Sequence, residues 1–521
     1  MTDREKFYIT TSIPYLNGAP HLGHALEYVQ ADVVARYFRA QGHDVWFLTG
    51  ADEHGAKIAR FVEAAKKNPK EFVDAQVEIF KQLLSALNIS HDDFIRTSDQ
   101  LRHWPGAQAL WKKLEAAGDI YKGTYKGLYC MGHEAFVTEK DLDGGVCRDH
   151  KKQPEAIEEE NYLFRLSKYK DRIKQSVETG ELSIIPEFRK TEMLNMLAEA
   201  EDVSFSRPSK DISWGIPVPD DATQTMYVWC DALSNYITAL GYGGANVARF
   251  EKFWPADAHV IGKDISRFHA IIWPAMLLSA NLPLPKKLIV HGFVHISGEK
   301  MSKSTGNVVD PLAICKKYGG EALRFYLFSE IPTFNDGDYT DKHFAETYAG
   351  LLVDGIGNLV SRVAKMVQTI GGVTKPLDDQ IARYPMKTKI ETPLTISSIS
   401  FESTAPALFI DQYMEPAHHQ YMSEYKIGEA IKNIWALFHA LDSYIEDYKI
   451  YKAIKDKPDE AKIMLWNCAY SLVSAARFLE PFMSETADKI FQTFGASNTL
   501  KGSWTEFRVT EIPHLFPKIE K

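Results

Sequence analysis

The hydrophobic positions at the start of the chain predict a strand, a helix and a second strand. Apolar and β-branched residues fill positions 7–11, and apolar residues then recur at spacings of three and four from Leu22 to Tyr37. That spacing is the period of an amphipathic helix. A second apolar run at residues 45–48 is followed by helical patterns that continue to about Leu87. This order of elements predicts a parallel βαβ unit.

The same alternation returns near Met226, with further strands expected at residues 258–261 and 288–291. We therefore predict an α/β catalytic domain with a parallel sheet, built from residues 1–113 and 226–294 and split by an insertion at 114–225. Ligands of such sheets bind beyond the carboxyl ends of the strands.

The rest of the chain predicts a helical bundle. From residue 348 onward, apolar residues that include Leu352, Ile356 and Val360 form one stripe along a helix. Residues 348–521 are assigned to this helical domain, and residues 295–347 to the region that joins it to the first domain. Residues 371–422 are rich in Pro, Thr and Ser and lack a clear period, which predicts a long loop or an inserted excursion.

Composition places the chain among ordinary globular proteins, with 45% hydrophobic and 25% charged residues. No apolar run reaches membrane-spanning length, and the first residues lack the apolar core of a signal peptide. Five cysteines, an odd number spread thinly, favour a reducing compartment, so a cytoplasmic location is expected. The net charge of −9 gives no indication of a nucleic-acid partner, although a local basic track is enough to bind phosphates.

Two short polar clusters carry the candidate chemistry. Residues 21–24 read His-Leu-Gly-His and open the first predicted helix, where free backbone N–H groups and the helix dipole attract anions. Residues 300–304 read Lys-Met-Ser-Lys-Ser and follow a predicted strand. Either cluster alone could be a solvent-facing turn or a basic surface loop. Their joint occurrence, each at a strand end, indicates a site for a nucleoside triphosphate.

This pair of motifs resembles that of the class I aminoacyl-tRNA synthetases, and the residues around it resemble the methionyl-tRNA synthetase family. The matching stretches are residues 13–18 (IPYLNG), 50–55 (GADEHG), 227–232 (YVWCDA), 261–265 (IGKDI), 268–274, 291–294 (HGFV) and 358–362 (NLVSR). The resemblance implies a Rossmann-type parallel-sheet catalytic domain, split by an inserted connective domain with a zinc knuckle at residues 130–150. It also implies an α-helical bundle that binds the anticodon, and it assigns residues 295–347 to the Lys-Met-Ser-Lys-Ser loop and a region that contacts the tRNA stem.

For ATP, the resemblance implies that His21 and His24 contact the phosphates, while Lys300 and Lys303 close over pyrophosphate on a mobile loop. The other implied ATP contacts are Gly23, Gly262, Asp264, Val294, Ser302 and Ser304. Among these, Asp264 is the expected acceptor for the ribose hydroxyls. Mg²⁺ is expected with ATP, although the sequence shows no dedicated cage for it.

For the amino acid, the resemblance implies a pocket that recognises the methionine thioether by shape and aromatic contact. The matching positions are Ile13, Tyr15, Trp229, Ala232, Tyr236, Ile265 and His269, with Asp52 as the partner of the substrate ammonium group. Without the resemblance, Trp229 and Tyr236 are more typical of core aromatics. The insertion is too small for the editing domain of the valine, leucine and isoleucine enzymes.

Cys130-x₂-His133 and Cys147-x₂-His150 have the spacing of a zinc knuckle, and we expect these four ligands to hold a structural Zn²⁺. The resembled family often has cysteines at all four places. The alternative is that Cys130 is a buried apolar residue and that the others lie at the surface.

In the helical domain, Asn358 and Arg362 lie four residues apart on one helix face. The resemblance implies that they contact splayed-out anticodon bases, although a solvated Arg and a surface Asn have the same pattern. Tyr451 lies where the family usually has a tryptophan, and is the expected aromatic contact to the anticodon.

The resemblance therefore implies an ATP-dependent, AMP-forming ligase that joins L-methionine to tRNA(Met), including the initiator, without a membrane partner. A monomer is expected, because no additional oligonucleotide-binding domain follows the bundle. Two alternatives stay open: a related nucleotidyltransferase that does not use tRNA, and a non-catalytic tRNA-binding relative. The helical region argues against the first, and the intact histidines and lysines argue against the second.

Overall fold

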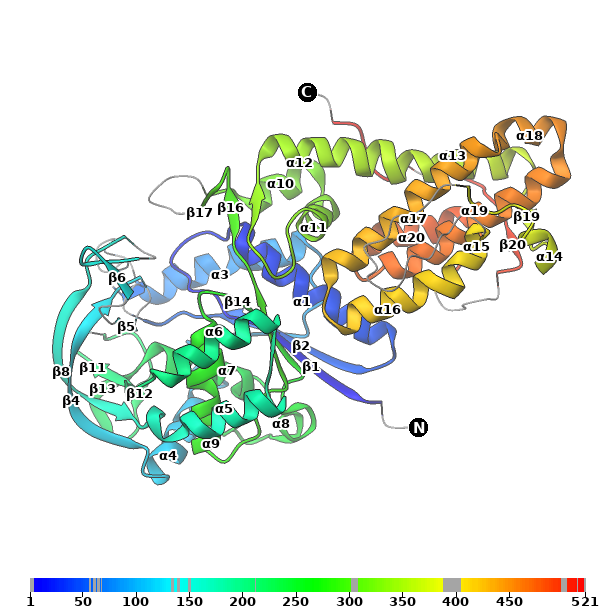
Figure 1. Cartoon of the computed structure of the whole chain (residues 1–521). Helices are drawn as coiled ribbons and strands as arrows, with labels where there is room; N and C mark the ends of the chain where they lie inside the picture. The colour runs from blue at the N-terminus through cyan, green and yellow to red at the C-terminus, as the bar shows by residue number, and fades with distance from the viewer. Residues whose placement is uncertain are drawn as a thin grey trace. The chain divides into compact units, whose positions relative to one another are not determined.

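The computed structural model describes residues 4–55, 58–59, 62, 66, 68–132, 135–137, 141–148, 151–210, 212–300, 308–387, 404–497, 504–512 and 514–519. The chain forms two compact units (Figure 1). Unit 1 comprises residues 1–85 and 89–292, and unit 2 comprises residues 86–88 and 293–521. Among the described residues, no helix is long and apolar enough to cross a membrane.

Unit 1 is built on a parallel sheet of six strands in the order β3-β2-β1-β14-β15-β9. The strands are β1 (Lys6–Thr11), β2 (Asp44–Ala51), β3 (Asp93–Arg96), β9 (Ser183–Ile185), β14 (Ala258–Gly262) and β15 (Lys287–His291). All five pairings are parallel. The chain runs outward from β1 through β2 to β3, and it later restarts beside β1 with β14. The strand order therefore reverses between β1 and β14, which is where open parallel sheets bind their ligands.

Helix α1 (Leu22–Ala40) covers the centre of this sheet and packs on β1, β2 and β14. Its apolar positions, among them Leu22, Leu26 and Val29, are buried as the spacing predicted. The predicted strands at 7–11, 45–48, 258–261 and 288–291 are all confirmed. The prediction of an α/β core with a parallel sheet is therefore correct.

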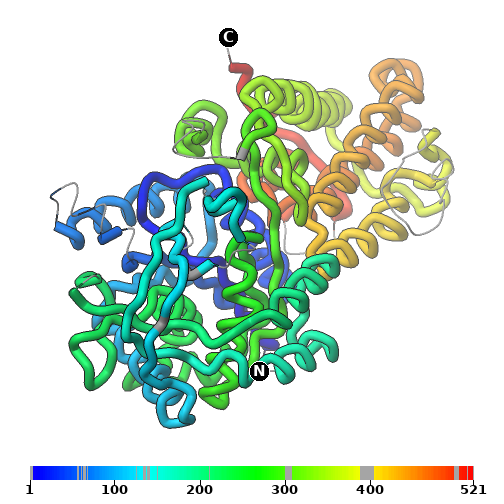
Figure 2. The backbone as a smooth tube through the Cα atoms, turned by 60° about the vertical axis from the view of Figure 1, so that its left-hand side comes forward, coloured from blue at the N-terminus to red at the C-terminus, as the bar shows by residue number. Residues whose placement is uncertain are grey.

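The insertion contributes a long antiparallel pair, β4 (Ile120–Cys130) with β8 (Glu155–Phe164), in a four-stranded sheet ordered β10-β8-β4-β5. Figure 2 shows these two strands running side by side in cyan. Residues 183–185, which we expected inside the inserted domain, instead form β9 at the edge of the parallel sheet. A strand of only three residues is too short to show an apolar period in the sequence.

The remaining elements of unit 1 are α3 (Pro69–Ala86, whose last residue belongs to unit 2), α4 (Trp104–Ala116), β5 (Ala135–Val137), β6 (Leu142–Asp143), β7 (Val146–Cys147), η2 (Leu166–Tyr169), α5 (Lys170–Thr179), α6 (Glu187–Ala198), β10 (Val203–Ser204), β11 (Ser206–Pro208), β12 (Pro217–Val218), β13 (Asp221–Met226), α7 (Val228–Thr238), α8 (Ala248–Phe253), η3 (Phe268–Ile272) and α9 (Trp273–Ser279).

Unit 2 is mainly helical, with a small sheet ordered β17-β16-β18. Its central helix α19 (Pro458–Leu479) is buried along most of its length and packs against α13, α15, α17, α18 and α20. The prediction of a helical bundle is confirmed. Buried Arg324 ties this unit together, because its guanidinium donates to the backbone oxygens of Leu87, Pro481 and Phe482.

The other elements of unit 2 are β16 (Val294–Ile296), β17 (Glu299–Lys300), α10 (Pro311–Tyr318), α11 (Gly320–Ser329), β18 (Gly337–Tyr339), α12 (Asp341–Thr347), η4 (Tyr348–Gly357), α13 (Asn358–Thr369), β19 (Val373–Thr374), α14 (Asp378–Ile381), α15 (Pro406–Phe409), η5 (Ile410–Met414), α16 (Glu415–Ser423), α17 (Ile427–Asp447), α18 (Ile450–Asp456), α20 (Ser484–Phe494) and β20 (Glu506–Phe507).

The prediction of a long loop at residues 371–422 is wrong for its last part. Residues 406–423 form the consecutive helical elements α15, η5 and α16, and part of this stretch lies buried against α17 and α19. Pro406 stands at the start of α15, where proline is tolerated, and Pro416 is the second residue of α16, which follows directly on the π-helical turn η5. Residues 388–403 lie outside the described part of the chain.

Candidate active site

Four strands of the parallel sheet end around the point where its order reverses. Ser12 follows β1, Asp52 follows β2, Gly262 ends β14 and His291 ends β15. Because these strands are parallel, their carboxyl ends lie at one edge of the sheet. The sequence-predicted residues of unit 1 gather at this edge.

His21 and His24 cap the start of α1 through their own ring nitrogens. His21 is the N-cap residue, and its Nδ1 accepts the Gly23 backbone N–H at 3.1 Å. His24 Nδ1 accepts the His21 backbone N–H at 3.2 Å, and the two rings stack with centroids 3.8 Å apart. A neutral imidazole whose Nδ1 accepts a hydrogen bond carries its hydrogen on Nε2. Both rings are therefore set to donate from Nε2.

Gly23 makes this capping arrangement sterically allowed. A Cβ at position 23 would lie 3.0 Å from Cε1 and 3.1 Å from Nδ1 of the His21 ring. The first turn of α1 contains no acidic residue, so the positive end of the helix dipole is not neutralised there. The start of α1 is thus suited to an anion such as a phosphate.

Glu27, one turn into α1, links two of the strand ends. One carboxylate oxygen accepts from the backbone N–H and hydroxyl of Ser12 at 2.8 and 2.6 Å. The other lies 3.0 Å from His291 Nε2, and His291 Nδ1 lies 2.8 Å from the Gly292 backbone oxygen. Both partners of the His291 ring are acceptors, so both its nitrogens donate. Burial would lower the pKa of His291, but the Glu27 carboxylate outweighs it and the pKa is raised.

The expected methionine-pocket residues lie together on one side of this edge. Tyr15 meets Trp229 edge to face, with ring centroids 6.1 Å apart, and Trp229 stacks on Phe268 at 3.7 Å. Tyr236 and His269 follow in the same aromatic cluster. Ala232, Ile13 and Ile265 belong to the apolar core that surrounds them. An aromatic and apolar wall of this kind suits a flexible thioether.

His269 is a neutral member of this wall. Its Nδ1 donates to the Ile265 backbone oxygen at 3.0 Å, and its Nε2 accepts from the Tyr236 hydroxyl at 2.7 Å. Burial lowers the pKa of His269 to about 4. The pocket therefore presents no imidazolium charge to an apolar ligand at neutral pH.

Asp52 is buried beside Tyr15. A β-bridge joins the two residues, and the Asp52 backbone N–H donates to the Pro14 oxygen at 3.0 Å. Its side-chain Oδ1 accepts from the backbone N–H of His54 at 3.2 Å. A carboxylate held at the rim of an aromatic pocket suits a cationic ammonium group.

Gly262 and Asp264 lie at the end of β14. A Cβ on Gly262 would come within 2.8 Å of an Asp264 carboxylate oxygen and 3.7 Å of the His291 ring. Glycine therefore leaves the space above the strand end open. Asp264 is exposed at this edge, as a residue that accepts from ribose hydroxyls must be.

Several expected ATP contacts belong to unit 2. Val294 is buried at the start of β16, and Lys300 ends β17. Ser302, Lys303 and Ser304 lie outside the described residues. The roles expected for these residues stay predictions.

Two of the four expected zinc ligands belong to one small buried cluster. Cys130 ends β4 and Cys147 ends β7, and both are buried in one small cluster with Val137. This placement fits two ligands of one closed site. His133 and His150 lie outside the described residues. Within the described part of the chain, no group of three or more His, Cys, Asp or Glu is placed to hold a metal.

The expected anticodon residues lie on two helices of unit 2. Asn358 is exposed at the start of α13, and Tyr451 is 45% exposed on α18. Arg362 lies one turn after Asn358, and its guanidinium donates to Asp442 at 2.7 Å and Glu446 at 2.6 Å. Two carboxylates thus hold Arg362 in place on α13.

Further polar residues at the site were not singled out from the sequence. Glu27, His54, Asp231 and His291 are all buried, and the last three fall inside motifs that were recognised as whole stretches. Glu27 interrupts the apolar stripe of α1 three residues after His24. A charged residue on a buried helix face was the available signal.

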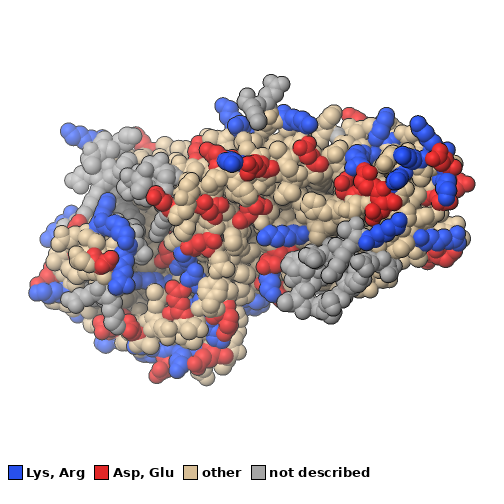
Figure 3. All heavy atoms as spheres, turned by 45° about the horizontal axis from the view of Figure 1, so that its top comes forward, with Lys and Arg blue, Asp and Glu red and all other residues tan. Residues whose placement is uncertain are grey.

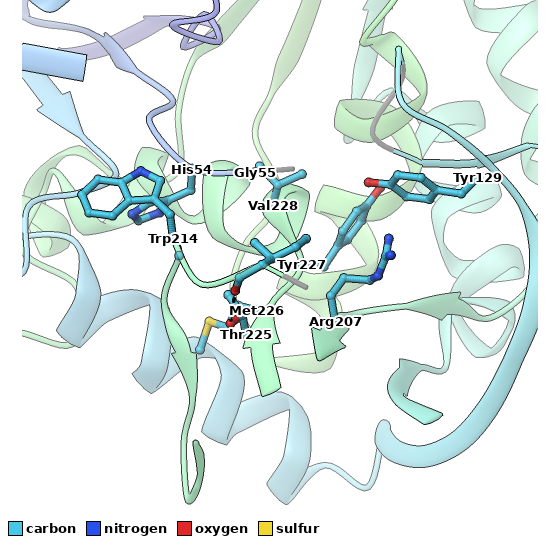
Figure 4. Close-up of a pocket in the computed structure, with 11 residues that line it drawn as sticks. His54, Gly55, Tyr129, Arg207, Trp214, Thr225, Met226, Tyr227 and Val228 are labelled. Carbon is cyan, nitrogen blue, oxygen red and sulfur yellow. Dashed lines mark hydrogen bonds between the residues drawn. The ribbon is translucent and has the colours of Figure 1, made fainter. Parts of the chain in front are cut away.

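A small pocket opens beside the Asp52–His54 turn. Figure 4 shows His54 and Trp214 together on one side of it, with Tyr129 and Arg207 on the other. The His54 and Trp214 rings are 5.6 Å apart, and the Arg207 guanidinium lies 4.5 Å from the Tyr129 ring.

Comparison with known families identifies the class of protein to which this sheet and site belong. A family model described as tRNA synthetases class I (M) matches residues 7–151 and 137–364. The matched stretch includes the parallel sheet, the capped start of α1 and the aromatic pocket.

Individual relatives indicate which family of this class the chain belongs to. A methionine–tRNA ligase of Clostridium acetobutylicum is 39% identical over 533 residues, which cover 100% of this chain and 79% of that protein. The Bacillus subtilis methionine–tRNA ligase is 37% identical, over 99% of this chain and 78% of that protein. The solved Mycobacterium tuberculosis methionyl-tRNA synthetase in complex with methionyl-adenylate superposes with a TM-score of 0.89 and 33% identity, covering 99% and 100% of the two chains. This chain belongs to the methionyl-tRNA synthetase family of class I tRNA synthetases.

Proposed function

We propose that this protein is a methionine–tRNA ligase. It activates L-methionine with ATP to give methionyl-adenylate and pyrophosphate, and then transfers the methionyl group to the 3′-terminal adenosine of tRNA(Met), including the initiator. The observation that supports this most directly is the combination, at one sheet edge, of a phosphate-suited helix start with a neutral aromatic pocket and a carboxylate beside it.

In the first step a methionine carboxylate oxygen attacks the α-phosphorus of ATP. The new O–P bond forms as the bond to the bridging oxygen breaks, and pyrophosphate leaves with that electron pair. The carboxylate is already ionised at neutral pH, so the reaction needs no general base. Catalysis then depends on holding the reactants in line and stabilising the phosphate charge.

The residues of unit 1 divide this work. His21 and His24 donate from Nε2 to phosphate oxygens, and the start of α1 adds its backbone N–H groups. Asp264 accepts from the ribose hydroxyls, while Gly262 and Gly23 leave room for the nucleotide. Asp52 pairs with the substrate ammonium group, and Ile13, Tyr15, Trp229, Ala232, Tyr236, Ile265 and His269 enclose the thioether.

The remaining contacts to ATP are assigned to residues that follow β15 in the sequence. Val294 meets the adenine through its backbone, and Lys300 and Lys303, with Ser302 and Ser304, close over the pyrophosphate. Mg²⁺ bound with ATP would neutralise part of the phosphate charge. These assignments follow the family motifs in the sequence.

The proposed tRNA contacts lie on the helical unit. Asn358, Arg362 and Tyr451 contact anticodon bases, with Tyr451 as the stacking surface. On the face drawn in Figure 3, Asp and Glu side chains lie beside Lys and Arg side chains, in keeping with the net charge of −9. Contacts to tRNA phosphates therefore depend on local basic positions.

Zinc, oligomeric state and location complete the proposal. Cys130, His133, Cys147 and His150 would hold a structural Zn²⁺ that ties the ends of the short strands of the insertion together. The domain bounds expected from the sequence are kept, except that residues 183–185 belong to the parallel sheet, and the protein acts as a cytoplasmic monomer.

The test is ATP–pyrophosphate exchange with each amino acid in turn, followed by charging of tRNA(Met). We expect ATP–pyrophosphate exchange that depends on methionine. We also expect charging of tRNA(Met) at a comparable protein concentration. Exchange with methionine but no charging of tRNA(Met) would favour the alternative of a nucleotidyltransferase that does not use tRNA. Binding of tRNA(Met) with no exchange by correctly folded protein would leave the non-catalytic relative.

A further inference from the structure

The structure contains a buried hydrogen-bond network beside the proposed methionine pocket. Asp231 on α7 is 1% exposed, and its two carboxylate oxygens are each paired with a histidine. Oδ2 lies 2.6 Å from His54 Nδ1, and Oδ1 lies 2.7 Å from His103 Nε2. His103 Nδ1 in turn lies 2.8 Å from the hydroxyl of Thr238. Thr238 follows Asp231 by about two turns of α7.

We propose that Asp231 and His54 are positioning residues for methionine binding, which fix the Asp52 turn against the helix that carries the aromatic pocket. This inference rests on the proposed function and adds to it two residues that do not touch the substrate.

Helix α7 lines the pocket with one face and carries the hydrogen-bond network on the opposite face. Trp229, Ala232 and Tyr236 follow one another at spacings of three and four, so they share the face that lines the pocket. Asp231 is two residues from Trp229, about 200° around the helix, on the opposite face. Thr238, seven residues after Asp231, lies on that same opposite face. The network therefore holds α7 from behind the pocket.

His54 connects this rear face to the proposed ammonium site. Its ring donates to Asp231, while its backbone N–H donates to Asp52 Oδ1 at 3.2 Å. Only Glu53 separates His54 from Asp52. A shift of the His54 ring is thus transmitted directly to the carboxylate that is expected to bind the ammonium group.

The turn is held on its other side as well. The Trp214 indole N–H donates to the Glu53 backbone oxygen at 2.6 Å. The Glu53 carboxylate accepts from Arg96 Nη2 at 3.0 Å. The bond from His54 to Asp231, in contrast to these two, leads to the pocket helix α7.

Stability alone does not account for the network. A buried carboxylate loses its hydration, and apolar residues of similar size often give equal or greater stability than a buried ionic cluster. Burial would raise the pKa of Asp231, yet the two histidines hold the pKa of this carboxyl below its ordinary value. His54 Nε2 has no hydrogen-bond partner among the described residues, so the bond to Asp231 and the Trp214 contact orient the ring.

The experiment compares paired variants by ATP–pyrophosphate exchange, with KM measured separately for methionine and ATP. His54→Leu removes the donor to Asp231, whereas His54→Asn places an amide N–H near the position of Nδ1. Asp231→Asn keeps the size of the side chain but turns one acceptor into a donor. Asp119→Asn is the matched control, because Asp119 is also buried in unit 1 and accepts from Lys168 and Ser279 at 2.7 and 2.8 Å.

We expect His54→Leu and Asp231→Asn to raise the KM for methionine about tenfold, because small displacements of binding groups are costly. The KM for ATP should stay within about twofold, and His54→Asn should restore methionine binding to within about threefold. Asp119→Asn should lower the melting temperature without changing either KM. Equilibrium dialysis with methionine alone should give the same order of affinities.

An unchanged methionine KM in both His54→Leu and Asp231→Asn would overturn the inference. So would an equal rise in Asp119→Asn, because the effect would then reflect lost stability. If Asp231→Asn does not fold, the difference between His54→Leu and His54→Asn decides. Absence of methionine-dependent exchange in the unaltered protein would instead contradict the proposed function itself.

Discussion

His24 Nδ1 accepts the backbone N–H of His21, and the two imidazoles stack 3.8 Å apart at the start of α1. A local backbone contact thus decides which nitrogen of each ring carries the hydrogen. The proposed phosphate contacts depend on Nε2 being that nitrogen.

Variants of His24 test this assignment. His24→Gln keeps an N–H near the position of Nε2, while His24→Asn keeps only a group near Nδ1. We expect exchange kcat to fall about tenfold in the first and about 100- to 1,000-fold in the second, the usual cost of losing a charge-stabilising donor. ¹⁵N NMR of the unaltered protein should show the Nε2–H tautomer for both rings. A larger loss in His24→Gln than in His24→Asn would contradict the assignment.

Asp52→Ala should abolish most methionine activation while leaving the fold intact. Removing one partner of a desolvated ion pair costs about 2–5 kcal/mol, or about 30- to 4,000-fold in methionine kcat/KM. The KM for ATP should change little, because Asp52 lies on the amino-acid side. Exchange kinetics and circular dichroism give the two measurements. Near-normal exchange in Asp52→Ala would refute the ammonium role.

The lowered pKa of His269 gives a pH-dependent contribution to stability. The unfolded imidazole binds a proton as pH falls through about 6.5, whereas the folded one resists protonation until about pH 4. Stability is therefore highest above pH 6.5 and falls as pH drops from 6.5 to 4, by up to about 3 kcal/mol from this group.

Denaturant unfolding at pH 7 and pH 5 measures this contribution. His269→Asn lacks the titrating ring, so its free energy of unfolding should depend less on pH than that of the unaltered protein. The difference isolates His269 from His418, whose pKa burial also lowers, to about 3. Equal pH dependence in both proteins would show that His269 is protonated in the folded state.

Metal analysis of the purified protein tests the zinc knuckle. We expect about one zinc per chain, lost in Cys147→Ser and on chelation, with a lower melting temperature. Cys468→Ser is the control, because Cys468 is a buried cysteine of unit 2 and is not one of the expected zinc ligands. Full stability of a zinc-free preparation, with Cys147→Ser indistinguishable from the unaltered protein, would leave Cys130 and Cys147 as ordinary core residues.

Arg362→Gln should raise the KM for tRNA(Met) in charging about tenfold or more, and leave methionine-dependent exchange unchanged. The control for loss of a positive charge is Lys365→Ala, because Lys365 is exposed and lies three residues after Arg362 on α13. Equal effects of the two variants would reduce the role of Arg362 to general electrostatic attraction. If the unaltered protein charged tRNAs with altered anticodons as well as tRNA(Met), this would also argue against an anticodon contact by Arg362.

The sequence predicted the parallel sheet and α1 well, because their signals are local. The strand at 7–11, the helical spacing from Leu22 and the capping histidines all lie within one βαβ unit. The ligand site was also predicted to lie beyond the carboxyl ends of the strands, because parallel strands share that edge of the sheet.

Other features depend on contacts between distant residues and left no local signal. β9 is a three-residue strand whose place beside β15 is set by pairing across about a hundred positions. The Asp231 network joins residues 54, 103 and 231, of which 54 and 231 fall inside recognised motifs and 103 falls in none. Residues 406–423 lack a clear apolar period, and their helical elements pack against α17 and against α19, which is distant in the sequence.

The strand order has a consequence for synthesis on the ribosome. β1 pairs with β14, so Ile9 cannot pair with Ala258 until that residue has left the ribosome. At ordinary elongation rates this delay lasts roughly 10–50 s. During that time one side of the nascent β1 has no strand to pair with, and such an open edge is a site where another chain can add. We expect the growing polypeptide to need a chaperone most during this interval.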